Sequence, residues 1–588
     1  MAQHSTNTTR NGGHQQPQRQ ESAPKLLPDS RDAGFNTRIL ASSCAATLSA
    51  LNFGWCVGEP NIPEDIIKEC LEGPEVSVNG FPTCLPMSST LWGLVVGLVA
   101  LGALSGSLVA GRAADRFGRK AVLLANNIFY IAGALLLGTS TTIAQLAIGR
   151  FVSGIGCGVS STVVATYNSE CAPVKVRGVL GTMLQLSVEF GIFFAQLIAI
   201  FLVHVPNWRV LFGLSGAISL VQLIWLPFLP ESPKFLISQG RFMDAGRALQ
   251  YLRPEHDITN ELNDMVAASS AADGDYTAEA AAALAATEAG FTSDASSTFN
   301  GVDASMAGKP AVIDKPETVS IRSVAPAQQT PPATTGIGII AILKGQTPDV
   351  IGHTVFCTLF LMGFQQWTGA KGIVFYSTTI LTKVFHLDHD QQRHIPNLAQ
   401  WVTIGLAGTG ILAVFASMNL IDRLGRRLLL LVSSGGIAVA CFVIVIGRVA
   451  DVKVLAVLAM FGFKLAYGLG MAPIPWLTAS EMVPYYALGA LSGFASALNW
   501  TMIFIIGLLF PVLTKYLDHY LFLPFALLNS MAFIVILLFV PETKGRHISD
   551  ILFHHGRSIH LVFSMPRKKA APAGSTLPGL DKALAAVV

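Results

Sequence analysis

Long apolar stretches recur along most of the chain, and each is long enough to cross a lipid bilayer as a helix. The hydrocarbon core of a bilayer is about 30 Å thick, which a helix of about 20 apolar residues spans. Twelve stretches meet this requirement, at residues 37–57, 90–111, 121–141, 144–166, 179–203, 208–229, 350–380, 397–421, 428–449, 453–478, 487–514 and 521–540. The pattern therefore predicts an all-α membrane protein with twelve transmembrane helices.

Polar stretches before, between and after these windows predict segments outside the membrane. Residues 1–36 are rich in Gln, Asn, Ser and Pro, which is typical of a disordered tail. Residues 230–345 divide the windows six and six. They begin with a helical pattern and continue, over residues 267–332, as an Ala-, Ser- and Thr-rich linker that we expect to be disordered. The predicted domains are thus two six-helix bundles, at 37–229 and 346–541, followed by a tail at 542–588.

Lysine and arginine residues are concentrated in the tail and loops that would share one side of the membrane. They are Lys25, Arg31, Arg38, Arg112, Arg116, Arg119, Lys120, Arg423, Arg426 and Arg427. The loop after the first window instead has six acidic residues and one lysine. Because positively charged loops stay in the cytosol, both tails and the linker are predicted to be cytosolic. The plasma membrane and a vacuolar or lysosomal membrane both stay open as the location.

Two cysteines, Cys70 and Cys84, lie in the acidic loop that is predicted to face outside. An oxidising exterior would allow a disulfide between them, although two free thiols fit the sequence equally well. The other six cysteines lie in or beside apolar stretches, and no CxxC pair occurs. The sequence therefore predicts no metal site.

Composition narrows the class of function. Of the 588 residues, 52% are hydrophobic and 13% are charged, about half the charge of a typical soluble protein. The main surroundings of the chain are therefore expected to be a lipid bilayer. The net charge of +3 provides no basic face, so nucleic acid is not an expected partner. No Gly-x4-Gly-Lys-Ser/Thr loop occurs, which argues against an ATP-driven pump. We expect neither enzyme activity nor a cofactor.

The two halves of the chain repeat three short motifs at nearly constant spacing. Residues 115–120 (DRFGRK) recur as 422–427 (DRLGRR), 307 positions later. Ser169-Glu170 recurs as Ser480-Glu481, and 230–234 (PESPK) is echoed at 541–545 (PETKG), both 311 positions later. Parallel repeats of this kind are typical of secondary transporters, in which the substrate site lies at the bilayer midplane between the halves.

The motifs taken together resemble a known family. In order they are Gly149-Arg150-Phe151, Glu170 with Arg177-Gly178, residues 230–233 (PESP), Gln365-Gln366 before Gly369, 422–427, 473–476 (PIPW) and 541–545. Over residues 37–550 the chain resembles the sugar-porter branch of the major facilitator superfamily, including facilitative glucose transporters and fungal hexose transporters. The resemblance implies two six-helix bundles that move a hexose-like sugar or polyol by alternating access, with the monomer as the working unit.

Charged residues of the repeated motifs form a predicted gating network at the cytosolic ends of the helices. Its members are Asp115, Arg119, Glu170, Arg177, Glu231, Asp422, Arg426, Arg427, Glu481 and Glu542. Opposite charges could pair between the two halves when the transporter faces outward and separate when it opens inward. The alternative is a set of incidental surface pairs worth about 0–1 kcal/mol each.

Amide and aromatic side chains inside the apolar windows are candidates for sugar binding. A sugar needs neutral hydrogen-bonding groups and a flat apolar surface for its C–H face. The resemblance assigns this role to Gln185, Gln365, Gln366, Lys371, Trp476, Asn499 and Trp500. The alternative is that the amides hold helices together and the tryptophans anchor at the interface. For the glycine pairs Gly102/Gly106 and Gly154/Gly158 we expect close helix packing.

Three positions depart from the family pattern and bear on the mechanism. Lys371 and Gly468 stand where the family usually has Asn and Glu, and Cys56 stands where proton-coupled relatives have Asp. The missing carboxylate favours facilitated diffusion. A proton-coupled symporter and a sugar sensor that binds without transporting remain alternatives.

Two charges within the windows are predicted to meet across the halves. Glu189 follows Gln185 by four residues, so a helix places both on one face. The resemblance places both this face and Lys371 at the cavity. A lone charge at membrane depth costs about 2.5–3.5 kcal/mol on insertion scales, so we expect Glu189 and Lys371 to form an ion pair that closes the cavity or relays a proton. Separate solvated charges are the alternative, and Lys464 is a rival partner for Glu189.

Overall fold

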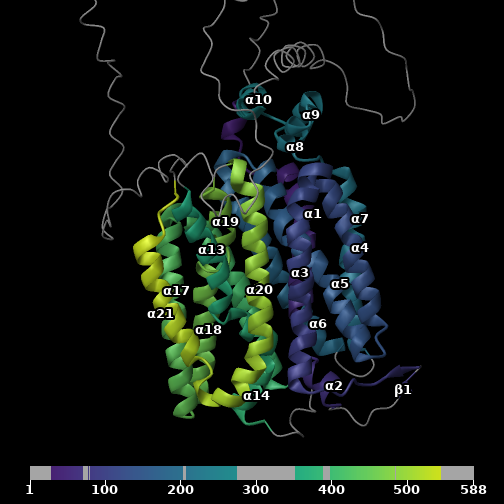
Figure 1. Ribbon diagram of the computed structural model, residues 1–588, viewed down its shortest axis with the longest axis vertical. Coiled ribbons are helices and arrows are strands. Elements are labelled where there is room, and N and C mark those ends of the chain that lie inside the picture. The colour runs from purple at the N-terminus through teal and green to yellow at the C-terminus, as the bar shows by residue number, and fades with distance from the viewer. Residues whose placement is uncertain are drawn as a thin grey trace, which may run out of the picture.

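The helices of the chain form two groups that stand side by side. The structure, a computed structural model, describes residues 28–70, 77–78, 80–202, 207–273, 351–387, 397–483 and 485–544. Helices from the first half of the chain lie on one side of the molecule and those from the second half on the other (Figure 1). We call these groups the N-lobe and the C-lobe.

The N-lobe consists of six long helices. They are α1 (Thr37–Gly58), α3 (Ser89–Phe117), α4 (Arg119–Gly138), α5 (Ile143–Cys171), α6 (Arg177–Leu202) and α7 (Trp208–Trp225). The C-lobe contains α13 (Gly352–Trp367), α14 (Ala370–Phe385), α16 (Leu398–Leu424), α17 (Arg426–Val449), α18 (Lys453–Leu469), α19 (Ile474–Glu481), α20 (Tyr485–Leu517) and α21 (Leu523–Phe539). The two lobes meet along α3 and α20, and along α6 and α16.

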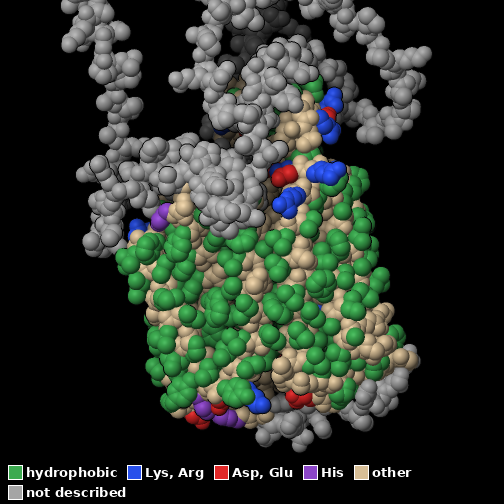
Figure 2. All heavy atoms as spheres, viewed as in Figure 1, with side chains coloured by type: hydrophobic (Ala, Val, Ile, Leu, Met, Phe, Trp, Pro, Cys, Tyr) green, Lys and Arg blue, Asp and Glu red, His purple; other side chains and the backbone are tan. Residues whose placement is uncertain are grey.

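Apolar side chains cover the flanks of both lobes. Figure 2 shows hydrophobic side chains over the side of the molecule, with Lys, Arg, Asp and Glu near its two ends. Large exposed apolar residues such as Leu135, Ile224 and Leu412 belong to this belt. Within the described residues, ten helices are long and apolar enough to cross a membrane, and α21 is a shorter apolar helix of 17 residues. The protein is therefore a multi-pass integral membrane protein.

Two of the predicted spans are broken rather than continuous. Between α13 and α14, Gly369 adopts φ +90°, a left-handed conformation that favours glycine. Between α18 and α19, the chain passes through Gly470 and Pro473, and a proline within a helix removes a hydrogen bond of the ladder. Apolar windows report length and hydropathy, so they did not reveal these breaks, which free backbone carbonyls inside the C-lobe.

The internal repeat is visible at the turns α3–α4 and α16–α17. Gly118 and Gly425 occupy these turns with φ +96° and +88°. Glu231 accepts hydrogen bonds from the backbone N–H groups of Arg119 and Lys120, and Glu542 accepts them from Arg426 and Arg427. A side chain at either glycine would collide with the capping carboxylate. The same device thus closes the same turn in each lobe.

Small residues let the N-lobe helices pack closely. A Cβ added at Gly102 or Gly106 would collide with the backbone of α5, and one at Gly154 or Gly158 with the backbone of α3. These are the two GxxxG pairs, so their predicted role in helix packing is confirmed.

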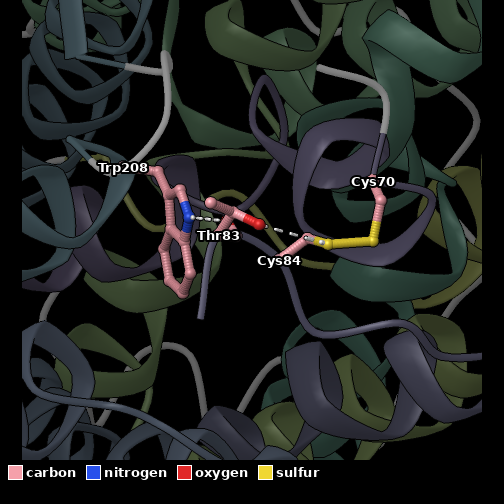
Figure 3. Close-up of a disulfide and its surroundings, with 4 residues drawn as sticks. All are labelled: Cys70, Thr83, Cys84 and Trp208. Carbon is pink, nitrogen blue, oxygen red and sulfur yellow. Dashed lines mark hydrogen bonds between the residues drawn. A yellow bond between two sulfur atoms is a disulfide. The ribbon is translucent and has the colours of Figure 1, made fainter. Parts of the chain in front are cut away.

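One end of the molecule, which we call the disulfide end, carries α2 (Glu64–Lys68), β1 (Ser77–Val78) and β2 (Phe81–Pro82). The two short strands pair antiparallel. A disulfide joins Cys70 to Cys84, and beside it the indole N–H of Trp208 donates to the carbonyl of Thr83 at 3.0 Å (Figure 3). The other six cysteines are free. Five of them are buried, and Cys44 is half-buried.

The opposite end, which we call the cap end, carries α8 (Pro233–Ser238), α9 (Phe242–Leu252) and α10 (Thr259–Asp273) above the lobes (Figure 1). Residues Ser30–Asp32 form a short 3-10 helix beside them: the Ser30 N–H donates to Asp257, and the Asn36 side chain donates to the Leu252 carbonyl. The prediction of a disordered tail is therefore wrong for residues 28–36. Residues 274–350, which include most of the predicted linker, and the tails at 1–27 and 545–588 lie outside the described residues.

Candidate functional site

Three amides from two helices of the C-lobe bond to one another in its interior. Gln365 Nε2 donates to the carbonyls of Met471 and Ala472, both at 2.8 Å, which the break between α18 and α19 makes available. Gln366 Nε2 donates to Gln365 Oε1 and Asn499 Oδ1, both at 3.1 Å. We call Gln365, Gln366 and Asn499 the amide cluster. Much of its hydrogen-bonding capacity is used within the protein, as the packing alternative expected.

One acceptor of the amide cluster is free. Gln366 Oε1 is buried and has no hydrogen-bond partner among the described residues. An unpaired buried amide oxygen costs about 1–3 kcal/mol. A ligand hydroxyl that donates to this oxygen would remove that cost, so Gln366 is the member of the cluster best suited to bind a sugar.

An aromatic surface shared by both lobes involves Trp500, which follows Asn499 on α20. The Trp500 ring centroid is 4.9 Å from that of Phe53 on α1, and its N–H donates to Ser161 Oγ on α5 at 3.2 Å. Trp476, on α19, is half-buried, and among the described residues we find no hydrogen bond or ring contact for it. The structure thus brings Trp500 into direct contact with the N-lobe.

The carboxylate of Glu189 forms an ion pair across the lobes, but its partner is Lys464. Lys464 Nζ lies 2.8 Å from Glu189 Oε2, and the two side chains are 5% and 2% exposed. Gln185 Nε2 donates to the other oxygen at 3.2 Å. A Cβ at Gly410 of α16 would lie 2.5 Å from both Glu189 Oε2 and Lys464 Cε, so this glycine makes room for the pair. The predicted pair of Glu189 with Lys371 is wrong because the rival partner on α18 takes the carboxylate.

Lys371 lies directly after the break at Gly369, as the second residue of α14. It is buried, and its Nζ lies 5.7 Å from the ring centroid of Phe53. Phe53 therefore has Trp500 and Lys371 as neighbours. Lys371 and Trp500 thus both contact the N-lobe through Phe53, whereas Gln366 and Asn499 bond within the C-lobe.

The charged clusters at the cap end pair within each lobe. In the N-lobe, Arg119 lies 3.0 Å from Glu170 and also bonds Asp115. In the C-lobe, Arg426 lies 2.8 Å from Glu481 and also bonds Asp422. In each cluster the aspartate lies one helical turn before the arginine, and the glutamate comes from another helix of the same lobe.

Pairing of these charges between the halves was predicted for the outward-facing state; among the described residues of this conformation no ion pair joins these charges across the lobes, and pairing in the outward-facing state stays a prediction. Arg177 is exposed and has no ion pair among the described residues. At the cap end Asp422 of the C-lobe comes close to Gly178 of the N-lobe, where an added Cβ would lie 2.7 Å from the carboxylate. Arg427 donates to the Leu537 carbonyl and so also bonds within its own lobe.

A second buried ion pair was missed by the sequence reasoning. Arg150 Nη1 lies 2.6 Å from Glu59 Oε1 and also donates to the Cys56 carbonyl at 2.7 Å. The two side chains are 1% and 0% exposed. The sequence identified Arg150 as part of a motif but not its partner. Glu59, the first carboxylate after Cys56, is the residue that could have indicated the pair.

The lobes also touch at the disulfide end. Asn61 Nδ2 donates to the Val374 carbonyl at 2.7 Å and to Ser377 Oγ at 2.8 Å, both on α14. Thr379 Oγ1 donates to Glu64 Oε2 at 2.8 Å. Contacts between the lobes therefore occur at both ends and between them.

The carboxyl of Glu64 makes stability depend on pH. Burial raises its pKa from 4.5 to about 7, against the opposing effect of Lys68 and with a further increase from Asp65. Since the folded-state pKa lies above the unfolded one, the contribution of Glu64 to stability is greatest below about pH 4.5 and is lost as the pH rises through about 7. We expect the thermal unfolding midpoint to fall less between about pH 5 and 8 in Glu64→Gln than in the wild type. An equal fall of the unfolding midpoint with pH in the two proteins would contradict this. Glu255 is exposed, so Glu255→Gln provides the control.

The chain matches a known family over most of its length. The model of the family described as "Sugar (and other) transporter" matches residues 34–295 and 341–552. The chain belongs to this family. The resemblance found in the motifs is thereby confirmed, and the protein is a major facilitator superfamily member.

Individual relatives agree with this assignment. The chain is 29% identical to human facilitated glucose transporter member 5 of solute carrier family 2, covering 87% of this chain and 90% of that protein. It is 28% identical to human member 7, covering 90% and 92%.

Solved structures show the same fold. The proton:xylose symporter XylE bound to 6-bromo-6-deoxy-D-glucose has a TM-score of 0.65 at 18% identity, covering 88% of this chain and 99% of that one. A partially occluded inward-open form of XylE from E. coli gives 0.61, also at 18% identity, covering 87% of this chain and 100% of that one.

Proposed function

We propose that this protein is a secondary transporter that moves a sugar across the membrane by alternating access. The observation that carries the proposal is the free acceptor Gln366 Oε1, buried beside Asn499, in a chain whose relatives are named for glucose transport. The aromatic contact of Trp500 with Phe53 on the other lobe supports a binding site between the lobes. Rocking of the lobes about such a site would expose it to each side in turn.

The test is uptake of a panel of labelled sugars into proteoliposomes. Gln366→Ala should weaken binding of the transported sugar by about 1–3 kcal/mol, because the sugar loses a buried partner, while the protein still inserts and folds. Gln145→Ala, an amide at the start of α5, is the matched control. Unchanged half-saturation in Gln366→Ala would assign this residue to packing. Binding of a sugar without uptake of any would instead indicate a sensor.

Proton-coupled symport is a second candidate, and the Glu59–Arg150 pair favours it. Cys56 stands where proton-coupled relatives have an aspartate. Glu59 follows three residues later, on the same face of the helix, and supplies a carboxylate in its place. It is fully buried against Arg150. A proton on Glu59 would release the arginine. In the uptake assay, stimulation by an inward proton gradient that disappears in Glu59→Gln would support symport, whereas indifference to the gradient supports facilitated diffusion.

We also propose that the cap end faces the cytosol. Arg112, Arg116 and Lys120 lie near this end, as the positive-inside rule requires, and the disulfide lies at the other end, where an exterior would be oxidising. Labelling of a tag at residue 10 on intact cells would contradict this orientation. The plasma membrane and a vacuolar or lysosomal membrane are both compatible with it. We expect the monomer to be the working unit.

A further inference from the structure

The ammonium of Lys371 has no anionic partner, although it lies deep between the lobes. Its side chain is 7% exposed, and among the described residues no hydrogen bond or ion pair engages it. The ring of Phe53, with its centroid 5.7 Å from Nζ, provides a cation–π contact. Such a contact recovers only part of the hydration that a buried ammonium loses.

The carboxylate that could neutralise Lys371 is already engaged. Glu189 interacts electrostatically with Lys371, but its Oε2 is paired with Lys464 at 2.8 Å and its Oε1 accepts from Gln185 at 3.2 Å. Glu189, Lys464 and Lys371 together therefore carry one positive charge in excess. The buried carboxylate of Glu59, near the end of α1, is likewise paired, with Arg150.

The excess charge lies beside the aromatic part of the proposed binding site, the pair of Phe53 and Trp500. Lys371 is the second residue of α14, just after the break that follows α13, and α13 supplies Gln365 and Gln366. Phe53, which faces the ammonium, also contacts Trp500. A ligand that reaches Gln366 Oε1 from between the lobes would lie near a cation as well as near amides and aromatic rings.

We propose that the sugar carried by this protein is an acidic one, a uronic or aldonic acid whose carboxylate pairs with Lys371. This inference rests on the proposed function, since it specifies the substrate class of that site. An anionic sugar supplies the charge that the site lacks and replaces the lost hydration of the ammonium with a charge-assisted hydrogen bond. The neutral hydroxyls of the same molecule then use the free oxygen of Gln366.

The experiment compares two ligands that differ at one carbon. Binding of D-galacturonate and D-galactose to the purified protein is measured at neutral pH, where the uronate is fully ionised. We expect the wild type to bind galacturonate at least tenfold more tightly. Lys371→Gln should weaken galacturonate binding about ten- to hundredfold, the range for loss of a charge-assisted hydrogen bond, and should weaken galactose binding much less, so that the preference for galacturonate is lost. Lys371→Arg should keep the preference, and Lys383→Gln, at an exposed position near the end of the same helix, is the matched control.

Three results would overturn the inference, and one would overturn the function beneath it. If the wild type bound galacturonate and galactose equally tightly, the carboxylate would contribute nothing to binding and the site would not select an acidic sugar. Equal weakening of both ligands in Lys371→Gln would give Lys371 a role in closure rather than in recognition. A preference that survives Lys371→Gln would assign the carboxylate to another cation. Failure of the folded wild type to bind or transport any sugar of the uptake panel would instead refute sugar transport itself.

Discussion

Replacing Arg150 by methionine is expected to lower the free energy of unfolding by about 3–5 kcal/mol, because the buried carboxylate of Glu59 then has no counter-charge. The two side chains are almost completely buried, and Arg150 also holds the Cys56 carbonyl. An apolar side chain of similar length fills the space but supplies neither bond. Thermal and denaturant unfolding of the purified protein in detergent would measure the loss.

The double variant separates charge from shape in this pair. Glu59→Gln combined with Arg150→Met removes both charges and should recover a large part of the lost stability. Arg241→Met is the control, since its partner Asp244 and Arg241 itself are both well exposed, and such pairs contribute about 0–1 kcal/mol. A loss in Arg150→Met no larger than in Arg241→Met would show that the buried pair does not stabilise the fold.

Breaking the Glu189–Lys464 pair is expected to reduce transport at least tenfold, whichever partner is removed. Glu189→Gln leaves the ammonium groups of Lys464 and Lys371, which repel each other electrostatically, without the carboxylate that offsets their charge. Lys464→Met leaves a carboxylate that still accepts a hydrogen bond from Gln185. Removing one partner of a buried pair costs about 3–5 kcal/mol, which shifts the balance between conformations in which the lobes are in contact and those in which they are apart. Uptake per folded molecule and the unfolding midpoint would both be recorded.

Recovery in the double variant identifies the true partner. Glu189→Gln with Lys464→Met should regain much of the activity, since the pair is removed as a unit. Glu189→Gln with Lys371→Met should not, because Lys464 would remain without its anion. If the second combination recovers activity and the first does not, the pairing seen between α6 and α18 is not the one that matters for transport.

Most of the fold follows from the sequence because hydrophobic length is a local property. The apolar windows located the long helices of both lobes, and the repeated motifs located the matching turns at Gly118 and Gly425. The apolar windows did not predict the breaks at Gly369 and after Leu469, because a broken helix has the same mean hydropathy as a continuous one. The docking of residues 28–36 beside α9 and α10 was also not predicted, because it depends on contacts with residues more than two hundred positions away.

The candidate site was predictable in its residues but not in their pairing. Helical periodicity places Glu189 beside Gln185 on one face, yet it cannot say whether Lys371 or Lys464 of the other lobe stands closer. Gly410, whose missing side chain leaves space for the Lys464 stem, decides this. The sequence grouped the charges of the gating network into the correct motifs, but it could not show which charges pair. Arg119 and Arg426 each bind two carboxylates within their own lobe.

The burial of the thiols makes the wild-type chain suitable for site-directed labelling. Two of the eight cysteines form the disulfide, five are buried, and Cys44 is only half-buried. A polar maleimide would therefore react mainly with a cysteine introduced at the surface, without prior removal of the native ones. Arg116 and Arg423 are exposed, occupy equivalent places in the repeat and lie one on each lobe. Spin labels or fluorophores at these two positions would report the distance between the lobes as the carrier turns over.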